Sequence, residues 1–181
     1  MQFDKEKIRS TLGERSKNDE GIGFIESTKE VLDFDEITQE VADRFRNKRP
    51  MGSCDALHIK DEGHIYLLEF KNARKSQIGK RFFLQKAYDS ALTLAFAFFP
   101  NLSLEEIKEK LYLIVVYNDG SVIEQEEKSE SFQAIKDEIR RLSGRKESIL
   151  FGLGVYEGIL YKKVLTVNKE VFMEEVYKEI F

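Results

Sequence analysis

Three ionisable residues whose spacing could support chemistry, Asp55, Glu69 and Lys71, lie in two neighbouring apolar segments. The segments, residues 54–60 and 64–71, are separated by three residues ending in glycine, which is typical of a β-hairpin loop. Such a loop sets the register so that Asp55 lies opposite Glu69, and the two-residue period of a strand places Lys71 on the same face. The sequence therefore predicts two carboxylates and one ammonium at one end of a hairpin.

The predicted proximity of two carboxylates requires a counter-charge. Directly opposed residues in an antiparallel ladder have β-carbons roughly 4.5 to 5.5 Å apart, and unpaired carboxylates at that distance repel or share a proton. A divalent cation such as Mg2+ resolves the conflict, because it binds one or two carboxylates and leaves its other positions to water and phosphate. The alternative is the solvated face of an edge strand. Residues 65–68 are apolar on both faces, which is typical of a central strand and favours the metal site.

The pattern of Asp55, thirteen intervening residues and then Glu69-Phe70-Lys71, with Pro50 shortly before it, resembles the signature of the PD-(D/E)XK nuclease superfamily. The resemblance covers the middle third of the chain, and its degenerate motif indicates the superfamily but no particular member. It implies that Asp55 and Glu69 bind Mg2+ or Mn2+ with the backbone carbonyl of Phe70, and that Lys71 assists the attacking water. The implied activity is hydrolysis of phosphodiester bonds in nucleic acid.

Two further features of the superfamily have less regular counterparts here. Some members carry Q-x-x-x-Y on the helix after the lysine; this chain has Gln85 and Tyr88, one residue closer together, and both are candidates for an accessory role. The first helix often supplies an additional acid, for which Glu40 is our first choice because it precedes the inward-facing Val41. The alternatives, besides a solvated glutamate, are Glu26, Glu30 and Glu36.

Positive charge is concentrated in the middle of the chain, although the net charge is -4. Between residues 44 and 86 there are eleven Lys and Arg against four Asp and Glu, a local excess of +7. Clusters of this kind bind the phosphate backbone, so we expect nucleic acid as the partner, with DNA preferred over RNA. The candidate nucleic-acid-binding residues are Lys75, Lys80, Arg81 and Lys86. The alternative is that these residues belong to ordinary solvated helix ends.

Periodicity predicts an α/β fold, a single domain over residues 1–181 with a mixed central β-sheet flanked by helices. The elements expected before residue 121 are helices over 4–15, 22–32, 35–47 and 80–99, the hairpin, and a strand over 111–117. Those expected after it are a helix over 132–142, strands over 148–156 and 159–167, and a final helix capped by Asn168. The resemblance implies a restriction-endonuclease-like core over about residues 35–120, followed by a C-terminal extension of sheet and helices over 121–181.

Composition limits the remaining classes. The 181 residues are 41% hydrophobic and 34% charged, ordinary for a globular domain, and a single cysteine excludes an intrachain disulfide. The longest apolar run, residues 91–99, is too short to cross a membrane, and no signal-like run follows a basic start, so we expect a cytoplasmic protein without a membrane partner. Two alternatives to a nuclease remain open. One is a non-catalytic member of the same fold acting as a binding or inhibitory module, and the other is a structural subunit of an oligomer such as a homodimer.

Overall fold

The structure, a computed structural model, describes residues 6–18, 21–46, 49–60, 63–73, 79–118 and 149–181. These residues form one mixed six-stranded sheet with the strand order β1-β2-β3-β4-β5-β6. Neighbouring strands from β1 to β4 are antiparallel, whereas β4, β5 and β6 run parallel to one another. The strands are β1 (Arg9–Thr11), β2 (Glu30–Asp33), β3 (Ala56–Ile59), β4 (Ile65–Lys71), β5 (Leu111–Tyr117) and β6 (Lys163–Asn168).

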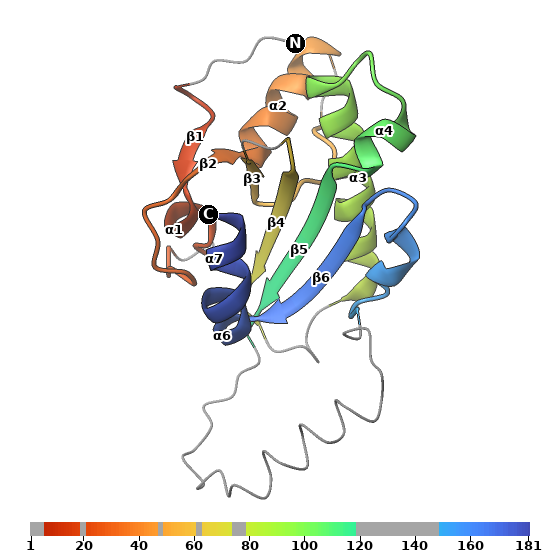
Figure 1. Cartoon of the computed structure of the whole chain (residues 1–181). Coiled ribbons are helices and arrows are strands. Elements are labelled where there is room, and N and C mark those ends of the chain that lie inside the picture. The colour runs from red at the N-terminus through yellow and green to blue at the C-terminus, as the bar shows by residue number, and fades with distance from the viewer. Residues whose placement is uncertain (1–5, 19–20, 47–48, 61–62, 74–78, 119–148) are drawn as a thin grey trace, which may run out of the picture.

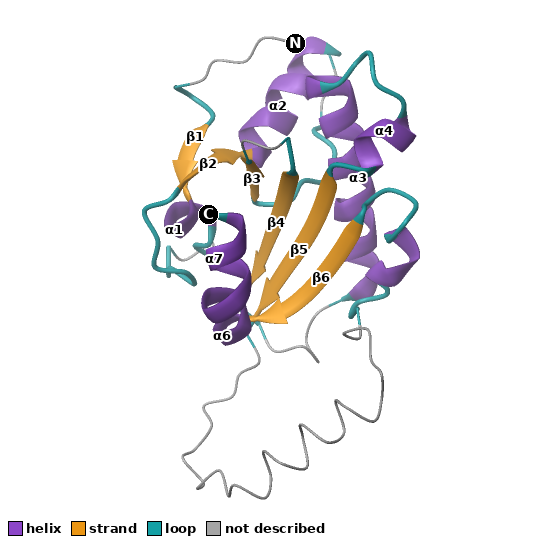
Figure 2. Cartoon of the chain, viewed as in Figure 1, coloured by secondary structure: helices purple, strands orange, loops and turns teal. Residues whose placement is uncertain are grey.

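Helices cover both faces of the sheet (Figure 1). On one face lie α2 (Phe34–Arg44) and α3 (Lys80–Phe98), and on the other lies the C-terminal helical segment, which is continuous in Figure 2. That segment comprises α6 (Lys169–Val171), the π-helical turn η3 (Phe172–Val176) and α7 (Tyr177–Ile180); the shorter elements elsewhere are α1 (Leu12–Arg15), α4 (Leu104–Lys108) and the 3-10 turn η2 (Leu153–Tyr156). The expected α/β fold with a mixed sheet flanked by helices is confirmed.

The two faces of β4 divide the hydrophobic core into two clusters. Leu67 packs in the cluster that contains Leu94 of α3, whereas Leu68 packs in the cluster that contains Phe172 of the C-terminal segment. Because side chains alternate along a strand, Glu69 follows Leu67 onto the α3 side. A strand that is covered on both faces therefore carries a carboxylate toward α3 as it reaches its end.

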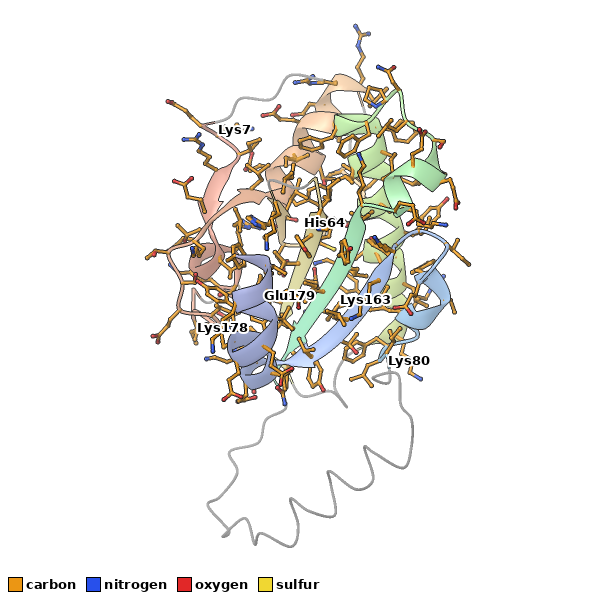
Figure 3. The ribbon with its side chains drawn as sticks, in the orientation of Figure 1. Lys7, His64, Lys80, Lys163, Lys178 and Glu179 are labelled. Atoms are coloured by element: carbon orange, nitrogen blue, oxygen red, sulfur yellow. The ribbon has the colours of Figure 1, made fainter. Side chains whose placement is uncertain are left out.

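The connection from β4 to β5 runs through α3, which begins on the side of the molecule where the parallel strands end (Figure 1). Figure 3 shows Lys80, the first residue of α3, at that end. The helix contributes Phe83, Ala87, Ala91, Leu94 and Ala97 to the hydrophobic core on this face of the sheet. Its exposed aromatic residues are Phe82, Tyr88 and Phe96, at 55%, 46% and 57% exposure. No helix in the described ranges, α3 included, is both long and apolar enough to span a membrane.

Three expected elements are wrong. The helix expected over 4–15 is a short strand, β1, followed by the single turn α1, and the helix expected over 22–32 is a loop that leads into β2. In the C-terminal part, the strand expected over 148–156 is replaced by turns and by η2. The hairpin strands, α2, the 80–99 helix, β5, β6 and the helix capped by Asn168 are confirmed within a few residues. The helix expected over 132–142 lies outside the described residues.

Candidate functional site

The β3–β4 hairpin has the predicted register. Leu57 lies opposite Leu67 and Ile59 opposite Ile65. Gly63 has a φ of +79°, the left-handed conformation that the last residue of a three-residue hairpin loop requires. The loop length and its glycine therefore determine which side chains of the two strands meet.

Asp55 lies at a bend immediately before β3, just beyond the last regular pair, Ala56 with Leu68. The Asp55 backbone N–H donates to the Leu68 carbonyl at 3.0 Å, and the Phe70 backbone N–H donates to Asp55 Oδ2 at 2.6 Å. The side chain of Asp55 thus accepts a hydrogen bond that a continued β3 backbone would otherwise take. This hydrogen bond holds the Asp55 carboxylate against the end of β4, next to Glu69.

The ammonium of Lys86, on the second turn of α3, joins the two carboxylates. Its Nζ lies 2.8 Å from both carboxylate oxygens of Glu69 and 3.6 Å from Oδ1 of Asp55. The three side chains are 18%, 3% and 19% exposed for Lys86, Glu69 and Asp55, so the cluster is largely shielded from water. The prediction that Asp55 and Glu69 lie together on one side of the hairpin is confirmed, and Lys86 is the residue that contacts both.

The burial of this cluster shifts the ionisation of its members. Burial first, and then the negative charge of Asp55, raise the pKa of Glu69 to about 8. Burial also raises the pKa of Asp55, opposed by the charge of Lys86 and by the Phe70 N–H. Burial alone would lower the pKa of Lys86, but the carboxylates outweigh it and the pKa is raised. A second positive charge near Glu69 would therefore favour its ionised form.

A cavity of about 340 Å³ opens onto this cluster. Four parts of the chain line it: residues 16–18 after α1, Asp55 before β3, the end of β4, and the start of α3. Its lining residues are Ser16, Lys17, Asn18, Asp55, Glu69, Phe70, Lys71, Asn72, Phe82 and Lys86. The predicted Asp55, Glu69, Phe70 and Lys71 thus share one cavity, and Lys71 lies on the same side as Glu69, as predicted. A ligand entering it would meet both carboxylates and three lysines.

A second hollow of about 260 Å³ lies between α2 and α3 and has a different character. Its lining is apolar apart from two threonines: Thr38, Val41, Ala42, Phe45, Met51, Thr93 and Phe96. No side chain in that lining is ionisable, so this hollow offers no acid, base or charged ligand. The cavity that contains Glu69, in contrast, is lined by ionisable side chains.

Arg15, at the end of α1, connects the N-terminal segment to Asp55 through a hydrogen bond and to two further aspartates through ion pairs. Its Nε donates to the backbone carbonyl of Asp55 at 2.9 Å, and its other nitrogens pair with Asp33 at 2.7 Å and with Asp35. The Ser53 hydroxyl also donates to Asp35, at the start of α2. The negative charge of Asp35 acts on Asp55, where it helps to raise the pKa. Asp35 is thus the acid of the first long helix that lies near the predicted ligands.

The structure places Glu40, the first choice for an additional acid, elsewhere on α2. Its carboxylate pairs with Arg44 at 3.5 Å along the same helix, and it is not among the residues that line the cavity around Glu69. Gln85 and Tyr88 are exposed on α3 and also lie outside that lining. Asp35, on an earlier turn of the same helix, is the acid that lies near Asp55.

The predicted nucleic-acid-binding residues separate into three groups. Lys86 contacts the carboxylates, whereas Lys80 and Arg81 are exposed at the start of α3. Lys75 lies outside the described residues. The basic first turn of α3 lies near Lys71, whose Nζ is 5.8 Å from the ring centre of Phe82 in that turn.

The site contains residues that the sequence reasoning missed, namely Arg15, Ser16, Lys17, Asn18, Asp35 and Asn72. Asn72 follows β4 directly, and its Oδ1 accepts a hydrogen bond at 2.7 Å from Asn118, which follows β5. Polar residues that follow neighbouring parallel strands meet at one edge of the sheet, so this pair had a signal in the sequence. The residues from the N-terminal segment had none, because their place depends on tertiary contacts.

The donor groups at the cavity fit a hard divalent cation that keeps several waters. Asp55 Oδ1 and both oxygens of Glu69 surround one positive charge, the ammonium of Lys86. The N–H and C=O of a strand residue point toward the same neighbour, so the Phe70 carbonyl is directed past the end of β3 on the side of Asp55. Across the described ranges, no group of three or more His, Cys, Asp or Glu side chains is arranged to hold a metal. Carboxylate and carbonyl oxygens are the type of ligand that Mg2+ and Mn2+ take in proteins.

Comparison with known proteins gives no relative for this chain. No family model, no curated protein and no solved structure matches it.

Proposed function

We propose that this protein is a metal-dependent phosphodiester hydrolase of the PD-(D/E)XK nuclease type, acting on nucleic acid. The observation that carries the proposal is the pair of shielded carboxylates, Asp55 and Glu69, meeting around one cation beside an open polar cavity. Two buried carboxylates lower stability unless a positive charge compensates them, and a bound divalent cation would supply that charge. Lys71, beside them on β4, completes the residue set of that class.

Each side chain has a role that follows from its place. Asp55, Glu69 and the Phe70 carbonyl would hold Mg2+ or Mn2+, which when bound supplies Lewis-acid stabilisation of the negative charge that develops on a phosphate. Lys71 lines the same cavity and would orient the attacking water and balance charge on the phosphate. Phe70 N–H fixes Asp55 Oδ2, which leaves Oδ1 directed toward the cluster.

Nucleic acid is proposed as the substrate because positive charge surrounds the cavity. Lys17, Lys71 and Lys86 line it, and Lys80 and Arg81 are exposed on the first turn of α3. Ammonium and guanidinium groups placed around a phosphate-binding point attract a polyanion and position its backbone.

The proposal is tested with single- and double-stranded oligonucleotides in Mg2+, Mn2+, Ca2+ and a chelator. We expect cleavage in Mg2+ or Mn2+ only, because the larger and looser coordination of Ca2+ does not reproduce a magnesium geometry. Glu69→Ala should abolish both cleavage and metal binding measured by calorimetry. Lys71→Ala should keep metal binding and slow cleavage by on the order of a hundredfold. The matched control is Glu105→Ala, a carboxylate 76% exposed on α4, which should change neither.

One observation favours a second candidate, a non-catalytic binding or inhibitory module of the same fold. Lys86 already donates to both oxygens of Glu69, so this carboxylate has a counter-charge without a metal. If Mg2+ and Mn2+ neither bind the wild type nor support cleavage of any DNA or RNA substrate, this candidate replaces the nuclease.

A further inference from the structure

Phe82 is an exposed aromatic ring at the edge of the polar cavity. It lies on the first turn of α3, is 55% exposed and lines the cavity together with Asp55 and Glu69. The next residue, Phe83, is 2% exposed and stacks on Phe151 at 5.0 Å between ring centres. The helix therefore uses Phe83 for the core and leaves Phe82 facing solvent at the cavity.

Two lysines of the site are arranged around the Phe82 ring. Nζ of Lys71 lies 5.8 Å and Nζ of Lys86 5.3 Å from the ring centre. Cation–π contacts are attractive, so they favour the arrangement in which the ring and the ammonium groups lie together. The cavity edge thus combines a flat apolar surface with positive charge only a few ångströms away.

This combination matches one kind of ligand, a flat ring joined to a phosphate. Sequence-tolerant binding of single strands depends on the same pairing, with bases stacked on aromatic side chains while basic residues hold the backbone. In an intact duplex the base faces are covered by their neighbours, so an aromatic ring reaches a base only where the strand is single, frayed or unpaired.

We propose that Phe82 is a stacking platform for an unpaired nucleobase, so that the cavity takes single-stranded nucleic acid or unpaired ends in preference to intact duplex. This inference rests on the proposed function, since it assigns the substrate of the same site. Phe82 positions the base, while the phosphate beside it meets Lys71 and Lys86.

The chain contains no tryptophan, so Phe82→Trp introduces a single fluorescent reporter at the platform. The control is Phe96→Trp, at a position on the same helix with 57% exposure that lines the apolar hollow instead. The probes are a short oligothymidylate, the same strand with abasic sites, and a duplex, all with a chelator so that no cleavage occurs. We expect the oligothymidylate to quench Phe82→Trp strongly, the abasic strand and the duplex to quench it weakly, and none of them to quench Phe96→Trp.

Affinity measured by fluorescence anisotropy provides the second readout. Phe82→Ala should weaken binding of the oligothymidylate by roughly 5- to 100-fold, as expected for loss of one base–aromatic stack, while Phe82→Tyr should keep it. Thermal unfolding checks that Phe82→Ala still folds, which is expected because the ring is exposed. Equal quenching by the abasic strand, or an unchanged affinity of Phe82→Ala, would overturn the stacking platform.

The two proposals fail in different ways. Cleavage in Mg2+ that prefers duplex and is unchanged in Phe82→Ala would leave the nuclease standing and overturn the platform. Binding of single strands that depends on Phe82, without cleavage in any metal, would uphold the platform and refute the nuclease.

Discussion

The buried position of Glu69 predicts an unusual dependence of stability on pH. Its pKa is raised from an ordinary value of 4.5 to about 8 in the folded protein. Between these two pH values the folded state keeps a proton that the unfolded chain releases, so folding is favoured at low pH and stability falls as pH rises. Most buried carboxylates that are paired in the native state give the opposite trend.

The size of the effect follows from the shift. At about 1.4 kcal/mol per pKa unit, a change from 4.5 to about 8 corresponds to a loss of up to about 5 kcal/mol across that pH window. The perturbation that removes it is Glu69→Gln, which keeps the shape of the side chain and cannot ionise. We therefore expect the stability of the variant, relative to wild type, to rise by several kcal/mol between about pH 5 and about pH 8.5.

The assay is urea unfolding at both pH values, with a chelator present so that metal binding does not contribute. Asp55 has a raised pKa as well and acts in the same direction, but it is present in both proteins and largely cancels in the comparison. The control is Glu174→Gln, an exposed carboxylate, which should follow wild type at both pH values. If the difference between Glu69→Gln and wild type changed by less than about 1 kcal/mol between the two pH values, the raised pKa would be refuted.

Two further predictions concern the cluster and the N-terminal segment. Lys86→Met removes the counter-charge of a shielded ion pair and should lower the free energy of unfolding by about 3–5 kcal/mol above pH 8. Lys7→Met, which breaks an exposed pair of similar length, should change it little, and urea unfolding of both variants measures the difference. Gly13→Ala would place a β-carbon 2.7 Å from the Ser27 carbonyl oxygen and should lower the free energy of unfolding by about 1–3 kcal/mol. The control Gly23→Ala meets nothing within 4 Å and should be neutral, and thermal unfolding compares the two variants.

The hairpin was predictable because its determinants are local. The three-residue loop with a terminal glycine, and the apolar pairs Leu57 with Leu67 and Ile59 with Ile65, set the register without reference to the rest of the fold. The same is true of β5 and of the helix that begins after Asn168, whose side chain accepts from the Val171 N–H. Residues that are close in sequence determine such elements, and their pattern is visible in the chain.

The N-terminal strands could not be predicted, because β1 has three residues and β2 has four. The equally short β3 was recognised from its hairpin loop, but no short loop joins β1 to β2. The spacing of Ile8 and Leu12 is also that of a helix. The contact of Lys86 with Glu69 could not be predicted from the sequence for a different reason. Charge composition placed Lys86 in a basic cluster, but only the rotation of α3 against the sheet determines which of its lysines meets the carboxylates.

The hydrogen bond from Arg15 to the Asp55 carbonyl has a consequence for dissecting this protein. A fragment of residues 35–120 would retain Asp55, Glu69, Lys71 and Lys86, yet it would lack Arg15, both strands before α2 and the last strand of the sheet. The cavity would also lose the wall formed by residues 16–18. The arrangement of the motif residues thus depends on segments far from them in the sequence. Grafting the motif alone onto another scaffold would transfer the residues but not their arrangement.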